Sequence, residues 1–498
     1  MSLAEVSDDS SRSHRHPGRL TRSSAARVLL WAAVLLGTAA RVAVLVIRPL
    51  WADEIFTLTL ARKSVPEILA ALRVDSGPPL HYLLAHVLLA PFGPAPGPAD
   101  VLVRVLSLVA SLLHLPLLVV VARRLGRPAL GLPAAALFAI FPLAVAYAAE
   151  GRAYALASLL ALVAFERALT LRERPHAAVA AGLTLAAAGA VLTHYLAVFP
   201  IAALAIFAWG ARPASRRALI ISGFAAAVLT APWAPTALHQ PRAAMAWLKG
   251  PEFGSAPANV LVNLAFGADP QDYAEGITTA LRIGAAALLA FVVAHAFLRG
   301  PRLLGVFVVT AGGLLLAGQV VTGALLLPLG RTAVVFLPFV ALLFAAAPPF
   351  FALAAGAVAV AALAHRLPQD AEASVGELLT RFVAPHVREG RTVCAAGYLG
   401  PELSYRLARA GAPAHVVFFP AAVAAHPGWY REEEIPRETL SGEAEALLAS
   451  PDRPTLYVLP RGFRASRALA SRLAPLQPRR LLGNPLLDVV EIPDSAAR

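Results

Sequence analysis

The sequence of 498 residues contains few charged residues and a single cysteine. Charged residues make up 15% of the chain, whereas hydrophobic residues make up 58%. With only Cys394 present, an intramolecular disulfide is excluded, and the sequence does not encode a redox compartment. The low charge leaves several uninterrupted apolar runs that reach the roughly 20 residues needed to cross a bilayer. We therefore predict a polytopic membrane protein.

Several motifs that would identify a soluble enzyme class are missing. The chain has no GxGxxG after a strand, no P-loop, no HExxH and no GxSxG. These absences give no support to dinucleotide binding, P-loop phosphate binding, zinc-dependent proteolysis or a serine hydrolase of the nucleophile-elbow type. The chemistry must therefore come from another set of residues.

Eleven apolar segments are expected to span the membrane. They cover residues 28–48, 100–122, 129–148, 152–171, 177–193, 196–211, 217–236, 277–298, 303–326, 332–347 and 349–365. A further run, 79–92, is too short for a full crossing. The predicted fold is an all-α polytopic membrane protein of about 11–12 transmembrane helices, followed by a small soluble α/β domain.

The formal charge of +13 is explained by membrane orientation and not by nucleic-acid binding. Much of the excess is arginine in the short connections "RRLGRP", "RERPH", "RPASRR" and "RGPR". Short loops rich in Lys and Arg stay in the cytoplasm, and we expect the basic tail, residues 1–27, to join them. The first apolar run is longer than the h-region of a cleaved signal peptide, so we interpret it as a retained anchor. Asp53, Glu54 and Glu150 then face the extracytoplasmic side of a bacterial plasma membrane.

Two further regions complete the predicted organisation. The outer loops 49–99 and 237–275 of the membrane domain, 28–365, are predicted to form helices lying along the membrane. Residues 366–498 form the soluble domain, with short strands expected at 391–397, 414–419, 455–460 and 487–492. We assign no chemistry to this domain and place it outside the cytoplasm.

The stretch "WADEIFTLTL" puts Asp53 and Glu54 side by side just after the first span, with Arg41 upstream inside that span. Two adjacent carboxylates in a partly buried site need a nearby cation or hydrogen-bond donor, and the arrangement suits a general base or a metal ligand. The alternative is a solvated turn that caps the helix beginning near Ile55. The residues alone leave both interpretations open.

A second cluster comes from "AYAAEGRAYAL". If this stretch is helical, Tyr147, Glu150 and Tyr154 share one face, and Arg152 projects elsewhere. A carboxylate beside two phenols can bind sugar hydroxyls or orient a base. The alternative is a set of ordinary residues at the membrane boundary.

Three other stretches supply candidate substrate-binding residues. "DSGPPLHYLL" places His81 and Tyr82 in the first turn of a helix, and "LTHYLAVF" places His194 and Tyr195 at an outer helix junction. Arg331 in "GRTAVVFLPF", Arg152, and the chain's two lysines, Lys63 and Lys249, are the cations available to a phosphate on the outer face. Each of these cations alone is also typical of a membrane-boundary anchor.

Together and in this order, these stretches resemble the GT-C superfamily of membrane glycosyltransferases. The nearest branch is the one with protein mannosyltransferases and the aminoarabinose transferase of lipid A, glycosyltransferase families 39 and 83. The resemblance covers about residues 28–365 and implies a donor sugar on a polyprenyl phosphate, an acceptor glycan, lipid or protein outside the cytoplasm, and a first-loop aspartate as base. By position that base is Asp53. Glu150, Arg152 and Tyr154 match the family's second motif, in which this chain has Gly151 and Ala153 where relatives often differ.

The implied reaction is a single displacement that inverts the anomeric carbon, catalysed by a hexosyl or pentosyl transferase. A carboxylate removes the acceptor proton, and arginine or lysine stabilises the leaving phosphate. Asp53 and Glu54 are also of the type that binds a divalent cation, as in some enzymes of the superfamily. Two alternatives remain: a flippase or transporter of lipid-linked sugars, and a polysaccharide polymerase or ligase.

Overall fold

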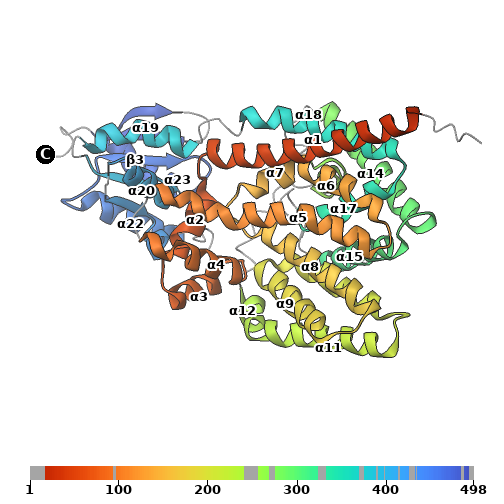
Figure 1. Ribbon diagram of the computed structural model, residues 1–498. Helices are drawn as coiled ribbons and strands as arrows, with labels where there is room; N and C mark the ends of the chain where they lie inside the picture. Colours follow the sequence, from red (N-terminus) through yellow and green to blue (C-terminus); the bar gives the residue numbers. More distant parts are fainter. Residues whose placement is uncertain are drawn as a thin grey trace, which may run out of the picture.

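We describe the protein from a computed structural model (Figure 1). It describes residues 17–93, 97–240, 256–267, 275–322, 333–369, 375–388, 391–397, 399–412, 415–425, 432, 435–483 and 487–492. The predicted fold class is confirmed. A large bundle of apolar helices is followed by a small domain with a five-stranded sheet.

Within the described residues, seven helices are long and apolar enough to cross a membrane. These spans are Ser24–Ile47, Pro98–Arg124, Tyr154–Glu173, Pro213–His239, Gly276–Leu298, Arg302–Val321 and Pro349–Pro368. They comprise α1 (Pro17–Ile47), η2 (Pro98–Arg104) with α5 (Val105–Arg124), α8 (Tyr154–Glu173), α11 (Pro213–Thr230) with η6 (Ala231–Trp233) and α12 (Ala234–His239), α14 (Glu275–Leu298), α15 (Arg302–Thr322) and α18 (Pro349–Gln369). Each corresponds to a span predicted from the sequence.

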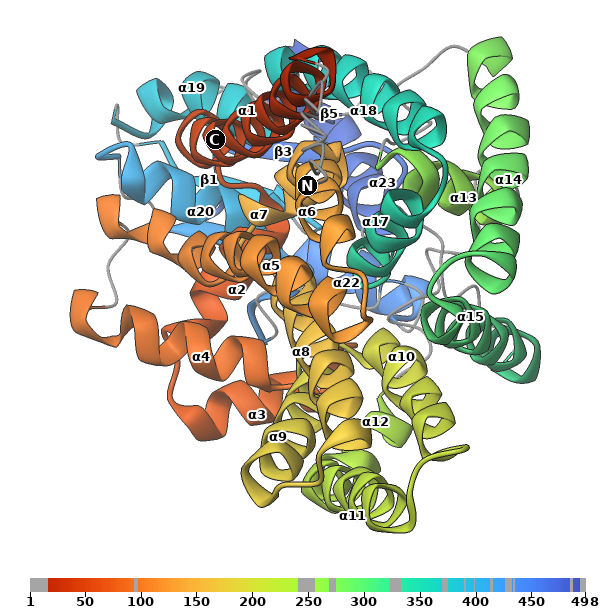
Figure 2. The same ribbon diagram turned by 45° about the vertical axis from the view of Figure 1, so that its right-hand side comes forward.

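The other four predicted spans are bent or short. The run 129–148 forms α6 (Gly131–Ile140) and α7 (Pro142–Ala148), which meet at an angle of 68°. The remaining three contain apolar helices of 10 to 17 residues. These are α9 (Ala177–Thr193), the run from η4 (Tyr195–Ala197) through α10 (Val198–Ala203) to η5 (Leu204–Ala208), and α17 (Leu337–Ala346). Figure 2 shows α14 and α15 at the edge of the bundle, whereas the residues of α17 are almost all buried.

The bend between α6 and α7 explains the buried Arg41 of α1. Pro142 has no N–H for the Phe138 carbonyl, and the Leu143 N–H donates to Gly267 instead of Ala139. Arg41 donates to both freed carbonyls, with N–O distances of 3.1 Å to Phe138 and 2.5 Å to Ala139. Gly37 allows this close approach, because a Cβ there would lie 2.1 Å from the Ala139 oxygen. Arg41 therefore joins α1 to the broken segment.

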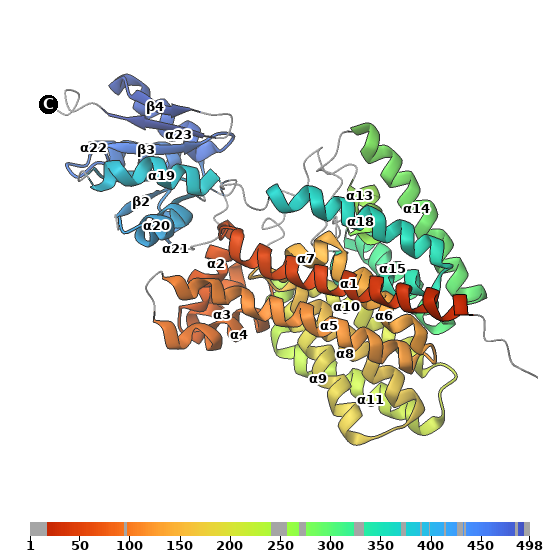
Figure 3. The same ribbon diagram turned by 45° about the horizontal axis from the view of Figure 1, so that its top comes forward.

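The stretch 49–99, predicted as an outer loop, contains three short helices, α2 (Ala52–Ala61), α3 (Val65–Val74) and α4 (Leu80–Leu89), and a 3-10 turn, η1 (Ala90–Phe92). The run Leu80–Phe92 is an apolar helix too short to span, as expected from the sequence. In the second loop, α13 (Ala256–Phe266) is also helical. The helices α2 to α4 lie at the end of the bundle next to the C-terminal domain (Figures 1 and 3).

The C-terminal domain is a three-layer α/β unit. Its strands, in the order β2-β1-β3-β5-β4, are β1 (Val393–Ala396), β2 (Val416–Phe419), β3 (Leu456–Pro460), β4 (Arg479–Gly483) and β5 (Leu487–Glu491). Strands β2, β1 and β3 run parallel, with Val393 opposite Val416 and Leu456. Strand β5 runs antiparallel to both of its neighbours, β3 and β4. The helices α19 (Val375–Arg388) and α20 (Leu399–Arg409) cover one face of the sheet, and α22 (Arg437–Ala449) and α23 (Arg464–Leu473) cover the other. A one-turn helix, α21 (Ala422–Ala425), follows β2.

Four of these strands lie where the sequence predicted them, whereas β4 was not predicted. The two domains meet through α20, which packs against α2 in the views of Figures 1 and 3. Tyr405 of α20 belongs to the same apolar cluster as Ile55, Leu58 and Val103 of the membrane domain.

Candidate active site

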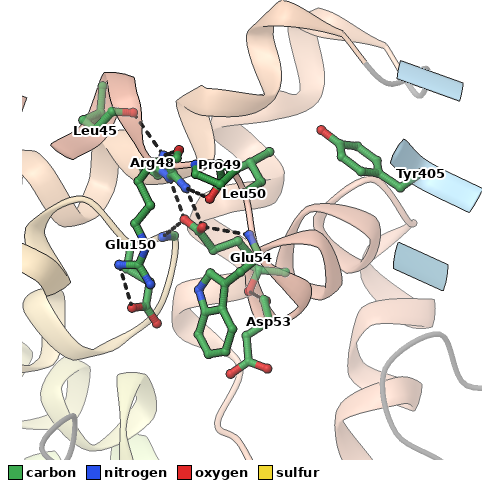
Figure 4. Close-up of polar contacts among 12 residues, drawn as sticks. Leu45, Arg48, Pro49, Leu50, Asp53, Glu54, Glu150 and Tyr405 are labelled. Carbon is green, nitrogen blue, oxygen red and sulfur yellow. Dashed lines mark hydrogen bonds and ion pairs between the residues drawn. The ribbon is translucent and has the colours of Figure 1, made fainter. Parts of the chain in front are cut away.

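The predicted acidic pair lies in the first turn of α2, where both side chains are buried. Trp51 is the N-cap, so Asp53 and Glu54 occupy the first turn, in which carboxylates interact favourably with the helix dipole. Successive residues of a helix point about 100° apart. Figure 4 shows the result: the carboxylates of Asp53 and Glu54 diverge, and the contacts drawn there are those of Glu54.

Glu54 is fully paired within the protein. Its Oε1 accepts from Arg104 Nε at 2.7 Å and from the Gly151 N–H at 2.8 Å, and its Oε2 accepts from Arg104 Nη2 at 2.6 Å and from the Trp51 N–H at 3.3 Å. Arg104 in turn donates to the carbonyls of Leu45, Arg48 and Pro49 at the end of α1. Both charged side chains are almost completely buried. The arrangement joins α2 to α1, to η2 and to the turn that contains Gly151.

Asp53 lies beside Arg152 and keeps slight contact with solvent. Its Oδ2 is 3.9 Å from Arg152 Nη2, and 7% of the residue is exposed. Arg152 Nη1 also donates to the Asp53 carbonyl at 3.4 Å, to Thr57 Oγ1 at 3.3 Å and to the Tyr82 hydroxyl at 3.4 Å. A carboxylate, a guanidinium and a phenol therefore gather around one point. We refer to Asp53, Arg152, Tyr82 and Thr57 as the Asp53 cluster.

Glu150 is the third buried acid near this cluster. It lies between the spans that end at Ala148 and begin at Tyr154. Its Oε2 is 3.7 Å from Arg48 Nη1, and its buried Oε1 has no hydrogen-bond partner among the described residues. Burial raises the pKa of Glu150 to about 7, because Arg48 offsets the loss of hydration only in part and the charges of Glu54 and Asp53 oppose ionisation. Glu150 is therefore a group that changes charge near neutral pH.

The stretch around Glu150 is not the continuous helix on which the sequence interpretation depended. The helix α7 ends at Ala148, residues 149–153 form turns, and α8 begins at Tyr154. Gly151 lies at this break, where a Cβ would come within 2.7 Å of Val103 and its N–H reaches Glu54. A glycine is thus required for η2 and this turn to approach each other. Tyr147 and Tyr154 still meet, with ring centroids 5.2 Å apart.

Aromatic side chains extend the site from Tyr154. Its ring centroid lies 5.2 Å from that of His194, which also accepts the Leu196 N–H. Tyr195 has a different environment: its hydroxyl donates to Gln240 Oε1 and accepts from Trp233 Nε1, both at 2.8 Å. Gln240 then donates to the carbonyls of Leu72 and Gly77. Tyr195 thereby supports the turn between α3 and α4.

The remaining predicted residues are distributed as follows. His81 and Tyr82 lie in the first turn of α4, as expected, and His81 Nε2 is 3.3 Å from the Gly151 carbonyl. Arg41 binds the carbonyls of the α6–α7 bend and Ser111, so its contacts in this structure are those of a packing residue. Lys249 and Arg331 lie outside the described residues. Two cations of the site, Arg48 and Arg104, were not predicted.

The arrangement of the carboxylate oxygens of Asp53 and Glu54 does not fit a metal ion that bridges the two residues. Both oxygens of Glu54 already accept from Arg104 and from backbone N–H groups, and the two carboxylates diverge (Figure 4). Among the residues that the structure describes, no group of three or more His, Cys, Asp or Glu side chains is arranged to hold a metal ion. We derive no catalytic step that passes through such an ion.

A cavity of about 530 Å³ lies where the end of α1 faces α19 and α20. Five arginines line it: Arg48, Arg104, Arg381, Arg406 and Arg409. Asp53 and Arg152 are not among its lining residues. The cavity therefore belongs to the junction between the two domains.

Comparison with known proteins gives similarity to solved structures alone. No family model and no curated protein matches the chain. ArnT from Cupriavidus metallidurans in the apo state is 15% identical, with a TM-score of 0.49 over 95% of this chain and 99% of that one. An oligosaccharyltransferase from Archaeoglobus fulgidus is 12% identical, with a TM-score of 0.47 over 86% of this chain and 69% of that one. Arabinofuranosyltransferase AftD from Mycobacteria is 14% identical, with a TM-score of 0.43 over 94% of this chain and 41% of that one.

At this identity, the comparison assigns no role to an individual residue of this chain. A further solved structure in the set is ArnT bound to undecaprenyl phosphate, at 16% identity and a TM-score of 0.47 over 94% of this chain and 98% of that one. The structural neighbours named here, ArnT, the oligosaccharyltransferase and AftD, are membrane glycosyltransferases of the GT-C superfamily, the superfamily whose motifs this sequence resembles.

Proposed function

We propose that this protein is a membrane glycosyltransferase that transfers a sugar from a polyprenyl phosphate to an acceptor on the extracytoplasmic side. One observation carries the proposal: the buried carboxylate of Asp53 lies 3.9 Å from the guanidinium of Arg152, with the Tyr82 hydroxyl on the same guanidinium. Transfer from a sugar phosphate needs a base for the acceptor and a cation for the leaving phosphate. The Asp53 cluster contains both.

In the proposed reaction, the acceptor hydroxyl attacks the anomeric carbon of the donor sugar. Asp53 removes the hydroxyl proton as the new C–O bond forms, a step that general-base catalysis accelerates by about 10²–10⁴-fold. The bond from the anomeric carbon to the phosphate oxygen breaks, and the polyprenyl phosphate leaves with the electron pair. A single displacement of this kind inverts the anomeric centre.

Arg152 is the proposed partner of the leaving phosphate. Negative charge accumulates on that phosphate as the glycosidic bond breaks, and a preorganised cation with restricted access to water stabilises it strongly. Only 17% of the Arg152 side chain is exposed, and its orientation is held by Thr57, Tyr82 and the Asp53 carbonyl. Glu54 has a supporting role here, because its oxygens already bind Arg104 and Gly151.

The position of the cluster suits a lipid donor. The short helices α2 and α4 lie at one end of the apolar bundle, so a polyprenyl chain can remain among hydrocarbon while its phosphate reaches Arg152. His194, which is partly exposed and in ring contact with the buried Tyr154, offers a surface that can stack against a sugar and bind its hydroxyls.

The test uses the purified full-length protein in lipid nanodiscs, a panel of radiolabelled polyprenyl-phosphate monosaccharides, and envelope lipids and glycans as acceptors. We expect labelled product from the wild type and a loss of turnover of at least about 100-fold in Asp53→Asn. Glu67→Gln, which replaces an exposed acid of α3, is the matched control and should retain turnover. Unchanged turnover in Asp53→Asn would remove this residue as the base. Movement of the intact donor across the bilayer of sealed proteoliposomes, without product, would instead identify a flippase.

A further inference from the structure

The helix α20 of the C-terminal domain holds α2 at both of its ends. The helix α2 has ten residues and is therefore about 15 Å long. Two neighbouring residues of α20, Tyr405 and Arg406, make the contacts, one toward each end of α2.

The contact at the end of α2 runs through Asp100. This carboxylate is completely buried and accepts from Arg62, the C-cap residue of α2, and from the Gly97 N–H. The Tyr405 hydroxyl donates to its Oδ2 at 2.5 Å, and Arg409 approaches the same oxygen at 3.7 Å. A buried acid that binds donors from both domains couples them, because losing the Tyr405 donor removes a hydrogen bond to a charged group, which contributes more to stability than one between neutral groups.

The contact at the start of α2 is made by Arg406. Its guanidinium donates to the carbonyl of Leu50, the residue immediately before the N-cap Trp51. Glu402, one turn earlier in α20, accepts from Arg406 Nε at 2.7 Å and fixes the direction of the guanidinium. Leu50 is three residues from Asp53, so this bond acts close to the carboxylate.

The ring of Tyr405 adds packing to these polar contacts. Only 9% of this residue is exposed, and it shares an apolar cluster with Ile55, Leu58 and Ala61 of α2. A side chain of the C-terminal domain is thus part of the core that supports α2. The distance from Asp53 to Arg152 depends on where α2 begins, and α20 contributes to fixing that point.

We propose that the C-terminal domain positions the base of the transfer reaction, with Tyr405 and Arg406 of α20 as positioning residues that set the location of Asp53 through α2. This inference rests on the proposed function. These residues bind Asp100 and the Leu50 carbonyl and pack against α2, so the proposed effect is on the geometry of Asp53 and not on donor binding. A general base must lie within hydrogen-bond reach of the proton that it removes, and turnover is therefore sensitive to such displacement.

The test compares Tyr405→Phe, Arg406→Gln and Arg406→Lys in the full-length protein. Arg472→Gln is the matched control, because Arg472 is an exposed arginine of the same domain that pairs with Glu445. We expect turnover to fall at least fivefold in Tyr405→Phe and Arg406→Gln, with the KM of the donor unchanged. Arg406→Lys, which keeps a donor for the Leu50 carbonyl, should recover at least half of the wild-type turnover.

Hydrogen exchange measured by mass spectrometry provides a second readout that needs no activity. Amides of residues 50–61 should exchange faster in Tyr405→Phe and Arg406→Gln than in the wild type, while those of α8 stay unchanged. The inference is overturned if turnover and exchange in residues 50–61 both match the control. It is also overturned if turnover, donor KM and thermal stability deteriorate together, since a merely structural role gives that pattern.

The two readouts separate this inference from the proposed function. If the wild type makes no glycoside product from any donor, the proposed function fails, and the positioning role in that reaction fails with it. Faster exchange in residues 50–61 would then show a mechanical coupling without a catalytic meaning. If the wild type is active and Asp53→Asn is inactive, but the α20 variants behave like Arg472→Gln, only the positioning inference fails.

Discussion

Glu54 and Arg104 form a two-point ion pair in which both side chains are almost completely buried, with N–O distances of 2.7 and 2.6 Å. Asp53, one residue earlier, lies 3.9 Å from a different arginine that is partly exposed. Two adjacent carboxylates of one helix therefore have separate environments. The fully paired acid supports the structure, and the other is the acid that we propose as the base.

Replacing Glu54 with Gln should strongly destabilise the protein. The change leaves the buried charge of Arg104 without its carboxylate, and breaking such a pair typically costs about 3–5 kcal/mol. Asp53→Asn is the matched control, and its cost should be smaller because Arg152 keeps Thr57, Tyr82 and the Asp53 carbonyl as acceptors. The measurement is thermal unfolding of both variants in the same detergent. Equal losses of stability would contradict the division of roles.

Arg152 should affect both binding and turnover of the donor. Removing a preorganised hydrogen-bond donor that stabilises developing charge lowers turnover by about 10²–10³-fold. We therefore expect a loss of turnover of this size in Arg152→Gln, together with a raised KM for the sugar donor. Arg152→Lys keeps the charge but not the planar fork, and should recover activity only in part. Steady-state kinetics with varied donor concentration checks this. Wild-type kinetics in Arg152→Gln would exclude Arg152 as the phosphate partner.

Glu150 should make stability depend on pH. Its pKa is about 7 in the folded protein and 4.5 as a free side chain. Between these values the folded state holds a proton that the unfolded state has lost, so the free energy of unfolding falls as pH rises from about 4.5 to 7. Over this interval, Glu150 lowers the free energy of unfolding by on the order of 3 kcal/mol.

Glu150→Gln removes the titration and should flatten this dependence. Thermal unfolding of the wild type and Glu150→Gln at pH values from 5 to 8 measures the difference. The stability of the variant relative to the wild type should be greatest at pH 8. Glu443→Gln, in the C-terminal domain, serves as a control for the loss of one negative charge. An unchanged slope in Glu150→Gln would show that another group titrates in this range.

The proposed location of the site predicts a definite topology. Reporters fused after residue 175 should lie in the cytoplasm, and reporters fused after residue 260 or 400 should lie outside it. The arginine-rich connections are the physical basis for this orientation. The opposite result at all three positions would mean that residues 79–92 cross the membrane fully.

Most of the fold could be predicted because hydrophobic length and strand composition are local signals. Each expected apolar segment corresponds to an apolar helix, a bent pair or a short helix run. The strand β4 was missed because "RRLLG" is an exposed edge strand that shows no alternation of apolar and polar residues. Pro142 is a local signal for a bend, but the angle of the bend depends on contacts from α1 and Gly267.

The site was predicted less completely because its partners are distant in sequence. The pair Asp53 and Glu54 was visible, but nothing local separates their roles, which are set by Arg104 and Arg152 some 50 and 99 residues away. Arg104 did leave a signal. It is an arginine near the start of an apolar run, and such a group usually has a buried partner. Asp100 and Arg62, which connect α2 to α20, carry no motif at all.

Arg41 has a consequence for how the chain assembles in the bilayer. Its guanidinium is completely buried, and its partners are Ser111 and the carbonyls of Gly37, Phe138 and Ala139. Phe138 and Ala139 follow Arg41 by about 100 residues in the chain. An arginine at the centre of an inserted helix costs about 2.5–3.5 kcal/mol until it finds partners. The helix α1 thus lacks two partners of this arginine until the sharply bent segment has been synthesised and has docked onto it, so α1 and that segment form a single unit of assembly.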